Sequence, residues 1–243
     1  MLALWKKELL TFFSSLTGSL VIAVFLVLNG LFLWVIPGNL NILFGGYANL
    51  DGLFYMAPWL YLFLVPAVTM RLFADEKKSG TIELLMTRPL SDWQIVTGKY
   101  LAGISLVVLS LLPTLIYFYT VSKIAQPEGN VDAGAIWGSY IGLVLLAGAY
   151  VAMGVFTSAI TDNQMVAFVL AALLAFTFYS GFEALASVPF FDGVKIFLVN
   201  LGIDSHYQSV SRGVIDLRDI LYFLGLIVVF LGLTRLVLSS RRW

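Results

Sequence analysis

Six long intervals of this sequence contain no Asp, Glu, Lys or Arg, and they restrict the fold more than any other feature. The intervals are residues 9–50, 52–70, 100–122, 133–161, 163–182 and 220–234. A helix needs about 20 apolar residues to cross the hydrocarbon core of a bilayer, and the first five intervals reach about that length. Only 12% of the chain is charged, about half the usual share of a soluble domain. The sequence therefore predicts an all-α integral membrane protein, with residues 1–243 forming one domain.

We place six transmembrane helices near residues 17–37, 55–73, 100–121, 136–158, 165–183 and 220–238. The sixth charge-free interval is the shortest. As a helix, its 15 residues (220–234) would rise only about 22 Å. Val237 and Leu238 lengthen the run, and the long side chain of Arg235 can reach the membrane surface from within it. We therefore expect residues 220–238 to cross the membrane.

The distribution of basic residues predicts that both termini are cytoplasmic. With the N-terminus inside, ten basic residues are cytoplasmic: Lys6, Lys7, Arg71, Lys77, Lys78, Arg88, Lys99, Arg235, Arg241 and Arg242. Four are then outside: Lys123, Lys195, Arg212 and Arg218. Cytoplasmic loops carry the excess of Lys and Arg in multi-pass proteins, so this orientation is the expected one.

Several classes of chemistry are excluded by composition. The chain has no cysteine and one histidine, His206, so cysteine-ligated and two-histidine metal sites are ruled out and no cofactor is expected. It contains no Gly-x-x-x-x-Gly-Lys-Ser/Thr motif for binding a nucleotide, and its net charge of zero gives no support to nucleic-acid binding. The predicted span interiors lack ionisable residues, which argues against an ion-driven transporter and against an intramembrane enzyme.

Two segments outside the spans have apolar patterns that predict short helices. In residues 1–16, the apolar residues Trp5, Leu9 and Phe12 recur at helical spacing opposite Lys7 and Thr11, which predicts an amphipathic interfacial helix in contact with lipid headgroups. Residues 183–219 form the largest outer segment, and its apolar stretch 194–202 is too short to cross. A re-entrant or interfacial helix that ends at Gly202 fits this stretch, and His206 after it is expected to be a surface residue.

The fourth predicted span begins with a glycine on each of three successive turns, at Gly134, Gly138 and Gly142. Such a stripe lets two helices approach closely in a membrane. It is compatible with a contact between subunits and with packing inside one subunit, and the sequence does not decide between them.

The densest motif lies in the predicted cytoplasmic segment, residues 74–98. Gly80 breaks the chain, Ile82, Leu85 and Met86 share one face of a short helix with Glu83 turned away, and Pro89 ends it. Ser91 and Gln94 then have the spacing of a capping box at the start of the next helix. A short amphipathic helix at this place either rests in the headgroups or docks into a groove of a soluble partner.

The residues of this segment resemble the type-2 family of ABC transporter permeases. The resemblance is most specific over residues 75–99 and extends to the N-terminal stretch 6–16. More narrowly, residues 30–35, 57–60, 66–71 and 202–213 resemble the gliding-motility-associated permease subunit of Bacteroidota.

The resemblance implies a fold and a set of partners. Six helices would form one half of a membrane unit, with an interfacial elbow helix at 1–16 and short outer helices at 184–202 that do not cross. A coupling helix would contact a separate cytoplasmic ATPase through Thr81, Ile82, Glu83, Leu84, Leu85, Met86 and Arg88. The expected partners are that ATPase, a second permease subunit in a homodimer or heterodimer, membrane lipids and an auxiliary gliding-motility subunit.

The function implied is that of a permease subunit in the bacterial inner membrane, without a catalytic site of its own. Hydrolysis of ATP by the partner would drive export or mechanical work in the envelope, linked to gliding motility. The alternative function is a membrane scaffold or anchor that docks a cytoplasmic partner without transport.

Overall fold

The computed structural model describes residues 1–87, 89–213 and 216–240, apart from the side chains of Thr17 and Met86. Every regular element in these residues is helical, and six of their helical segments are long and apolar enough to cross a membrane. The predicted all-α fold with six membrane-spanning helices is therefore confirmed.

Several of the six spans are built from consecutive helical pieces. The first is α2 (Leu16–Gly30) with η1 (Leu31–Val35), and the second is α3 (Asp51–Thr69) with α4 (Arg71–Lys78). The third is α6 (Asp92–Leu111), η2 (Leu112–Thr114) and α7 (Leu115–Ile124), where Pro113 produces a single 3₁₀ turn. The fourth is α8 (Ala133–Ile160), the fifth is α9 (Gln164–Phe176), η3 (Thr177–Gly181) and α10 (Phe182–Ala186), and the sixth is α13 (Leu217–Ser239).

The sixth span is longer than its charge-free interval. Its helix includes Asp219 in the first turn and Arg235 near the end. The guanidinium of Arg235 lies over the ring of Trp93, 5.3 Å from its centroid, at the start of α6. Both charged residues therefore lie near the ends of the helix, which leaves the middle apolar as a span requires.

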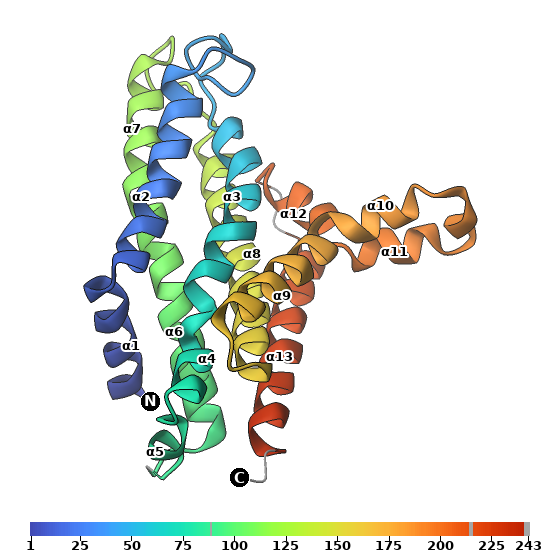
Figure 1. Cartoon of the computed structure of the whole chain (residues 1–243). Helices are drawn as coiled ribbons and strands as arrows, with labels where there is room; N and C mark the ends of the chain where they lie inside the picture. Colours follow the sequence, from blue (N-terminus) through green and yellow to red (C-terminus); the bar gives the residue numbers. More distant parts are fainter. Residues whose placement is uncertain (88, 214–215, 241–243) are drawn as a thin grey trace.

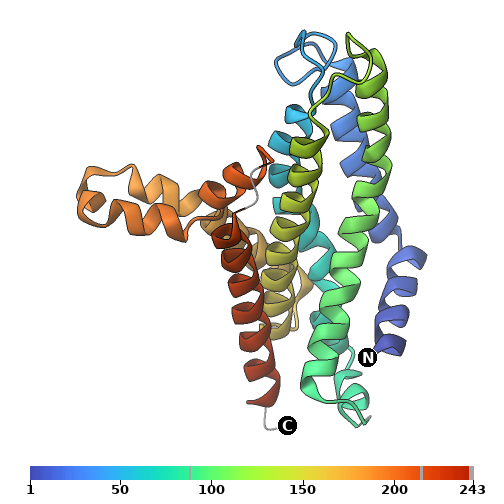
Figure 2. The ribbon, with the colours of Figure 1, turned by 180° about the vertical axis from the view of Figure 1, so that it is seen from behind.

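The bundle has two distinct ends. The start of α1 (Leu2–Ser14), the short helix α5 (Ile82–Met86) and the end of α13 lie together at one end (Figure 1), here called the terminal end; the opposite one is the far end. Seen from behind, α6 and α7 form one long rod that runs beside α2 (Figure 2). An even number of spans places both termini on one side, as the basic residues predicted.

The helix α8 is the centre of the bundle. In its most apolar stretch 78% of the residues are buried, against 22% for the first, fifth and sixth spans. It packs against α3, α6, α9 and α13. Small residues make this possible: a Cβ added at Gly154 would lie 1.9 Å from Oγ1 of Thr69 in α3, so the two helices touch at this point.

A break in the second span is held by α8. Between α3 and α4, the Ser158 hydroxyl donates to the carbonyl of Met70 at 2.9 Å and accepts from the backbone N–H of Phe73 and Ala74 at 2.9 and 3.1 Å. Backbone groups at a helix break need partners in an apolar interior, and Ser158 supplies them.

The end of the fifth span and the segment after it form an arm at the side of the bundle. Here α10 and α11 (Lys195–Leu201), joined by η4 (Pro189–Val194), project sideways in both views (Figures 1 and 2). The chain then returns to the bundle through α12 (Ile203–Val210). The expected helix does end at Gly202, but this glycine has a φ of −76° and not the left-handed conformation common at helix ends.

The inward face of α1 differs in detail from the predicted one. Leu4, Glu8 and Phe12 are buried, whereas Leu10 and Phe13 are exposed. The Trp5 indole N–H also donates to Oγ of Ser105 in α6 at 3.1 Å. The helix α1 is therefore docked on the bundle along one stripe and presents a second apolar stripe outward.

The contact between α3 and α8 gives a prediction about stability. Gly154→Ala forces a Cβ into the side chain of Thr69, so we expect a loss of about 1–3 kcal/mol. The matched variant is Gly225→Ala in α13, where an added Cβ meets nothing within 4 Å. Thermal unfolding of both variants in detergent measures the difference, and equal midpoints would contradict the close approach.

Candidate functional site

The segment that joins the second and third spans forms a short helix at the tip of the terminal end (Figure 1). Gly80 precedes it with a φ of +70°, which glycine adopts without strain. After the helix, Ser91 Oγ accepts from the backbone N–H of Gln94 at 3.3 Å, and the Gln94 side chain accepts from the backbone N–H of Ser91 at 3.0 Å. The predicted capping box is confirmed and fixes where α6 begins.

The predicted contact residues of α5 point in different directions. Ile82 is only 2% exposed and packs into the core of its own chain, while Leu84 is 67% exposed. Glu83 and Thr81 are exposed, and Leu85 is half-buried. Arg88 and the side chain of Met86 lie outside the described residues. The surface that α5 offers is therefore formed by Thr81, Glu83 and Leu84 rather than by Ile82.

A groove runs between α5 and α1. Its volume is about 370 Å³, and it is lined by Ala3, Leu4, Lys7, Glu76, Thr81, Leu84, Leu85 and Leu90. Leucine side chains form much of this wall, and one acid and one base lie at its rim. The groove thus extends the exposed surface of α5 towards the N-terminal helix.

A group of four charges, three of them on largely buried side chains, lies near α5. The side chain of Lys99 in α6 is 0% exposed, and its Nζ lies 3.0 Å from Oε1 of Glu8 and 2.9 Å from Oε2 of Glu76. Lys7 Nζ lies 3.3 Å from Glu8 and 3.1 Å from Glu76. We call Lys7, Glu8, Glu76 and Lys99 the Lys99 cluster. It joins α1, α4 and α6 through two acids and two bases.

Lys99 has two further contacts besides the carboxylates. Its ammonium also donates to the carbonyl of Leu72, and it lies 5.0 Å from the centre of the Phe73 ring. A buried ammonium without such partners would be strongly unfavourable. The carbonyl, the ring and the two carboxylates together compensate for its removal from water.

The outer member of the cluster, Lys7, remains a cation at neutral pH. Burial, the largest effect, lowers its pKa, but Glu8 and Glu76 together raise it above its ordinary value of 10.5. Because the raised pKa belongs to the folded state, the stability that Lys7 contributes is present below about pH 10.5 and is lost as the pH rises through the higher value. The cluster keeps this contribution throughout the neutral range.

No sequence pattern indicates the Lys99 cluster directly. In the sequence Lys99 is only one of the cytoplasmic basic residues, and its partner Glu8 is 91 positions away. One indirect signal exists, because Gly98 precedes Lys99 and an added Cβ there would lie 3.3 Å from Leu4 in α1. A small residue beside a lysine at the start of a span marks a close approach of two helices.

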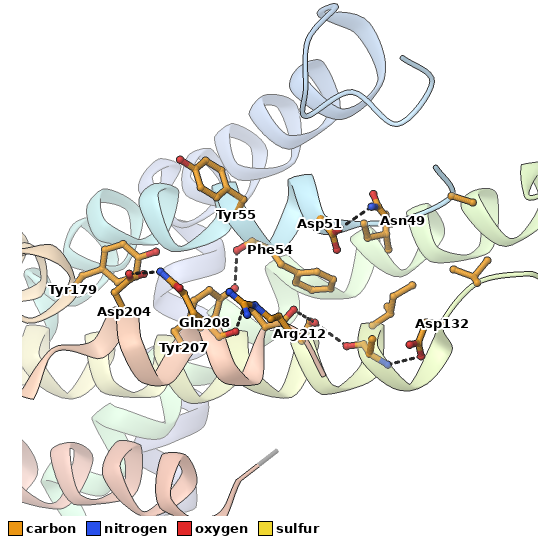
Figure 3. Close-up of a pocket in the computed structure, with 17 residues that line it drawn as sticks. Asn49, Asp51, Phe54, Tyr55, Asp132, Tyr179, Asp204, Tyr207, Gln208 and Arg212 are labelled. Atoms are coloured by element: carbon orange, nitrogen blue, oxygen red, sulfur yellow. Dashed lines mark hydrogen bonds between the residues drawn. The ribbon is translucent and has the colours of Figure 1, made fainter. Parts of the chain in front are cut away.

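A larger pocket of about 610 Å³ lies towards the far end, between α3, α8 and α12 (Figure 3). Tyr207 donates to the carbonyl of Phe54 at 2.7 Å, and Gln208 donates to Asp204 at 2.6 Å. The charged residues of its wall are Asp51, Asp132, Asp204 and Arg212. No group of three or more acids and histidines in the described part of the chain could hold a metal ion.

The glycine stripe of α8 contacts the same chain. An added Cβ at Gly138 would lie 2.7 Å from Cα of Gly213, and one at Gly142 would lie 2.8 Å from the Val210 side chain. At Gly134 the nearest atom is Oδ1 of Asp132, at 3.4 Å. Gly138 and Gly142 thus allow α12 and the residues after it to approach α8 closely.

These features define a multi-pass membrane protein with a short exposed helix between its second and third spans. Residues 3–242 match the family described as ABC-2 family transporter protein. The chain therefore belongs to this family, and it is a permease subunit of a type-2 ABC transporter. No curated protein matches the chain.

The Lys99 cluster gives a second prediction about stability. Lys99→Met removes the buried cation of Glu8 and Glu76 and leaves them only the exposed Lys7, so we expect a loss of about 3–5 kcal/mol. Lys78→Met is the matched control, because Lys78 is exposed at the same end of the bundle. Thermal unfolding in detergent reports the difference.

The triple variant Lys99→Met, Glu8→Gln, Glu76→Gln removes the uncompensated charges together with the lysine. We expect it to recover a large part of the loss. A Lys99→Met protein that unfolds like Lys78→Met would show that the cluster does not stabilise the fold.

Proposed function

We propose that this permease subunit couples to a separate cytoplasmic ATPase through α5. The observation that carries the proposal is the exposure of Leu84 and Glu83 at the tip of the terminal end, on a helix whose other side is anchored by Ile82. An exposed leucine beside an exposed acid suits a docking contact that is apolar at its centre and charged at its rim. The groove beside α1 extends the surface that a partner would cover.

The Lys99 cluster supports a mechanical role for this contact. The helix α5 lies in the chain between α4 and α6, and both carry members of the cluster. A displacement of α5 would therefore move the end of the second span and the start of the third together with α1. Hydrolysis of ATP would take place in the partner, and this chain would convert the partner's movement into a rearrangement of its spans.

We infer that the second permease subunit, identical or different, does not contact the glycine stripe. Gly138 and Gly142 are occupied by residues of their own chain, and we propose that Gly134, Gly138 and Gly142 serve packing within the subunit. The first, fifth and sixth spans have the least buried apolar stretches. They are the surfaces left for a second subunit or for lipid, while Leu10 and Phe13 of α1 would contact the headgroup layer.

We propose that the terminal end faces the cytoplasm of a bacterium and that the spans cross its inner membrane. The ten-to-four distribution of basic residues supports this orientation. The link to gliding motility, with an auxiliary subunit of that machinery, is supported by the resemblance of residues 30–35, 57–60, 66–71 and 202–213. Transport of an ion needs ionisable residues within the spans, and the centres of these spans have none. This favours mechanical work in the envelope over the movement of an ion.

A charge reversal on α5 tests the coupling proposal. Glu83→Lys removes an acid from the docking surface and adds repulsion to a basic or amide-lined groove, and such changes cost about 2–5 kcal/mol at a desolvated contact. We expect capture of the ATPase and stimulation of its hydrolysis to fall by at least about tenfold. Leu84→Asp should act in the same way, because Leu84 is exposed and contributes little to the fold.

The matched control is Glu128→Lys, the same exchange in a loop at the far end, where Glu128 forms only an exposed pair with Lys123. Pull-down of the ATPase in detergent and its hydrolysis rate are measured for all variants. Coupling through α5 is refuted if Glu83→Lys binds and stimulates like the unmodified chain. Equal loss in Glu128→Lys would place the contact at the far end.

Reporter fusions test the orientation separately. Fusions after Arg88 and after the C-terminal residue should report the cytoplasm, and fusions near Asn130 and Gln208 should report the outside. The physical reason is the retention of Lys-rich and Arg-rich segments on the cytoplasmic side. A cytoplasmic signal at Asn130 would contradict the six-span topology.

A further inference from the structure

The last turn of α11 is held by side chains from two other helices. The Ser205 hydroxyl donates to the carbonyl of Val199 at 2.9 Å, and the Tyr222 hydroxyl donates to the carbonyl of Leu201 at 2.6 Å. Nε2 of His206 lies 3.0 Å from the carbonyl oxygen of Asn200. The final carbonyl groups of a helix have no partners of their own, so these three side chains attach the arm to α12 and α13.

His206 lies between two hydrogen-bond acceptors. Its Nδ1 is 2.7 Å from Oδ1 of Asp219, while its Nε2 faces the carbonyl of Asn200. A neutral imidazole carries one N–H and can donate to only one of them. With Asp219 ionised and His206 neutral, one ring nitrogen would turn a lone pair towards an oxygen. Both contacts form only when the pair holds one additional proton.

We propose that His206 and Asp219 form a proton-binding site that fastens the arm to the bundle. With the proton bound, Nδ1 contacts Asp219 and Nε2–H donates to Asn200, so α11 is tied to α13. Loss of the proton leaves the pair with a single donor, which Asp219 retains because a hydrogen bond to a carboxylate is stronger than one to a carbonyl. The bond to Asn200 then opens, which leaves the last turn of α11 held by the Ser205 and Tyr222 bonds alone.

The surroundings of the pair contain few competing charges. From α13 the imidazole meets Asp219 and the ring of Tyr222, on which it stacks at 4.0 Å, and from α11 it meets the carbonyl of Asn200. On its own helix, Asp204 is engaged by Gln208, and Tyr179 from η3 and Glu183 from α10 lie beside Asp204. Arg218, next to Asp219, forms no salt bridge in the described residues. The proton is therefore shared by His206 and Asp219 alone.

A change at the His206–Asp219 pair would alter the position of the whole arm. It is attached to the bundle through α10 at one end and through the last turn of α11 at the other, and its apolar residues Phe190, Ile196 and Phe197 are exposed. Loss of the His206 bond weakens the second attachment without removing it, so we expect positions of the arm farther from α13 to become more populated. Imidazole is the side chain that titrates between about pH 5 and 8, so the attachment would respond to acidity on the far side of the membrane.

The absence of cysteine allows a direct measurement on the full chain in lipid nanodiscs. Nitroxides are attached at Phe197→Cys in α11 and Leu224→Cys in α13, both exposed, and their separation is recorded by pulsed EPR from pH 5 to pH 9. We expect one narrow distance at low pH and a growing second population as the pH rises. The ratio of the two changes by at most about tenfold per pH unit for a single proton. A label pair at Leu221→Cys and Leu236→Cys, both within α13, should keep one distance throughout.

Two variants separate the proton site from ordinary packing. In Asp219→Asn the amide donates to Nδ1 of a neutral imidazole, whose Nε2–H still donates to Asn200, so the arm should stay attached at every pH. In His206→Phe the ring has no N–H for either acceptor, so the second population should be present at every pH. Thermal unfolding of both variants checks that the bundle is intact.

Two outcomes would overturn the proposal. One is a distance distribution of the unmodified chain that is the same at pH 5 and pH 9. The other is an Asp219→Asn protein that keeps the pH dependence of the unmodified chain, since the titrating group would then lie elsewhere. Neither result depends on the ATPase or on transport, so the test stands apart from the proposed function.

Discussion

A lysine fully enclosed by protein determines the arrangement of the terminal end. An ammonium in an apolar interior is tolerated only beside opposite charges and hydrogen-bond acceptors, and Lys99 has Glu8, Glu76 and the carbonyl of Leu72 around it. These partners belong to α1 and α4, so a displacement of either helix from α6 removes one of the two carboxylates that compensate Lys99. The short helix α5 lies between α4 and α6 in the chain and takes its position from this arrangement.

Most of the fold could be predicted from the sequence because the bilayer leaves few alternatives. Long intervals without charge must become spans, and the Ser91–Gln94 spacing predicted the start of α6, which the structure places at Asp92. The boundaries were less accurate where charged residues continue a helix beyond the apolar interval. The second span, for example, extends from Asp51 to Lys78 and not over residues 55–73.

The contacts between distant charges could not be predicted in this way. Periodicity places Lys7 on the polar side of the first helix but cannot show that Glu8 faces a lysine 91 positions later. It also cannot show that Ile82 packs into the core of its own chain, so that Leu84 is the exposed apolar residue of α5. His206, expected to be a surface residue, has instead a carboxylate partner in α13. In each case the deciding partner is brought close by tertiary packing alone.

The last span links the two ends of the molecule. In its first turn Asp219 contacts His206, and Tyr222 follows to bind the end of the arm. Near its other end Arg235 lies over Trp93, in the first turn of α6, the helix that follows α5 in the chain. Between these contacts α13 is an uninterrupted helix that packs along α8. A continuous helix changes length very little, because every turn is held by backbone hydrogen bonds. A shift at Trp93 would therefore reach the arm as a movement of the whole helix, passed on through the bond of Tyr222 to Leu201 and the contact of Asp219 with His206.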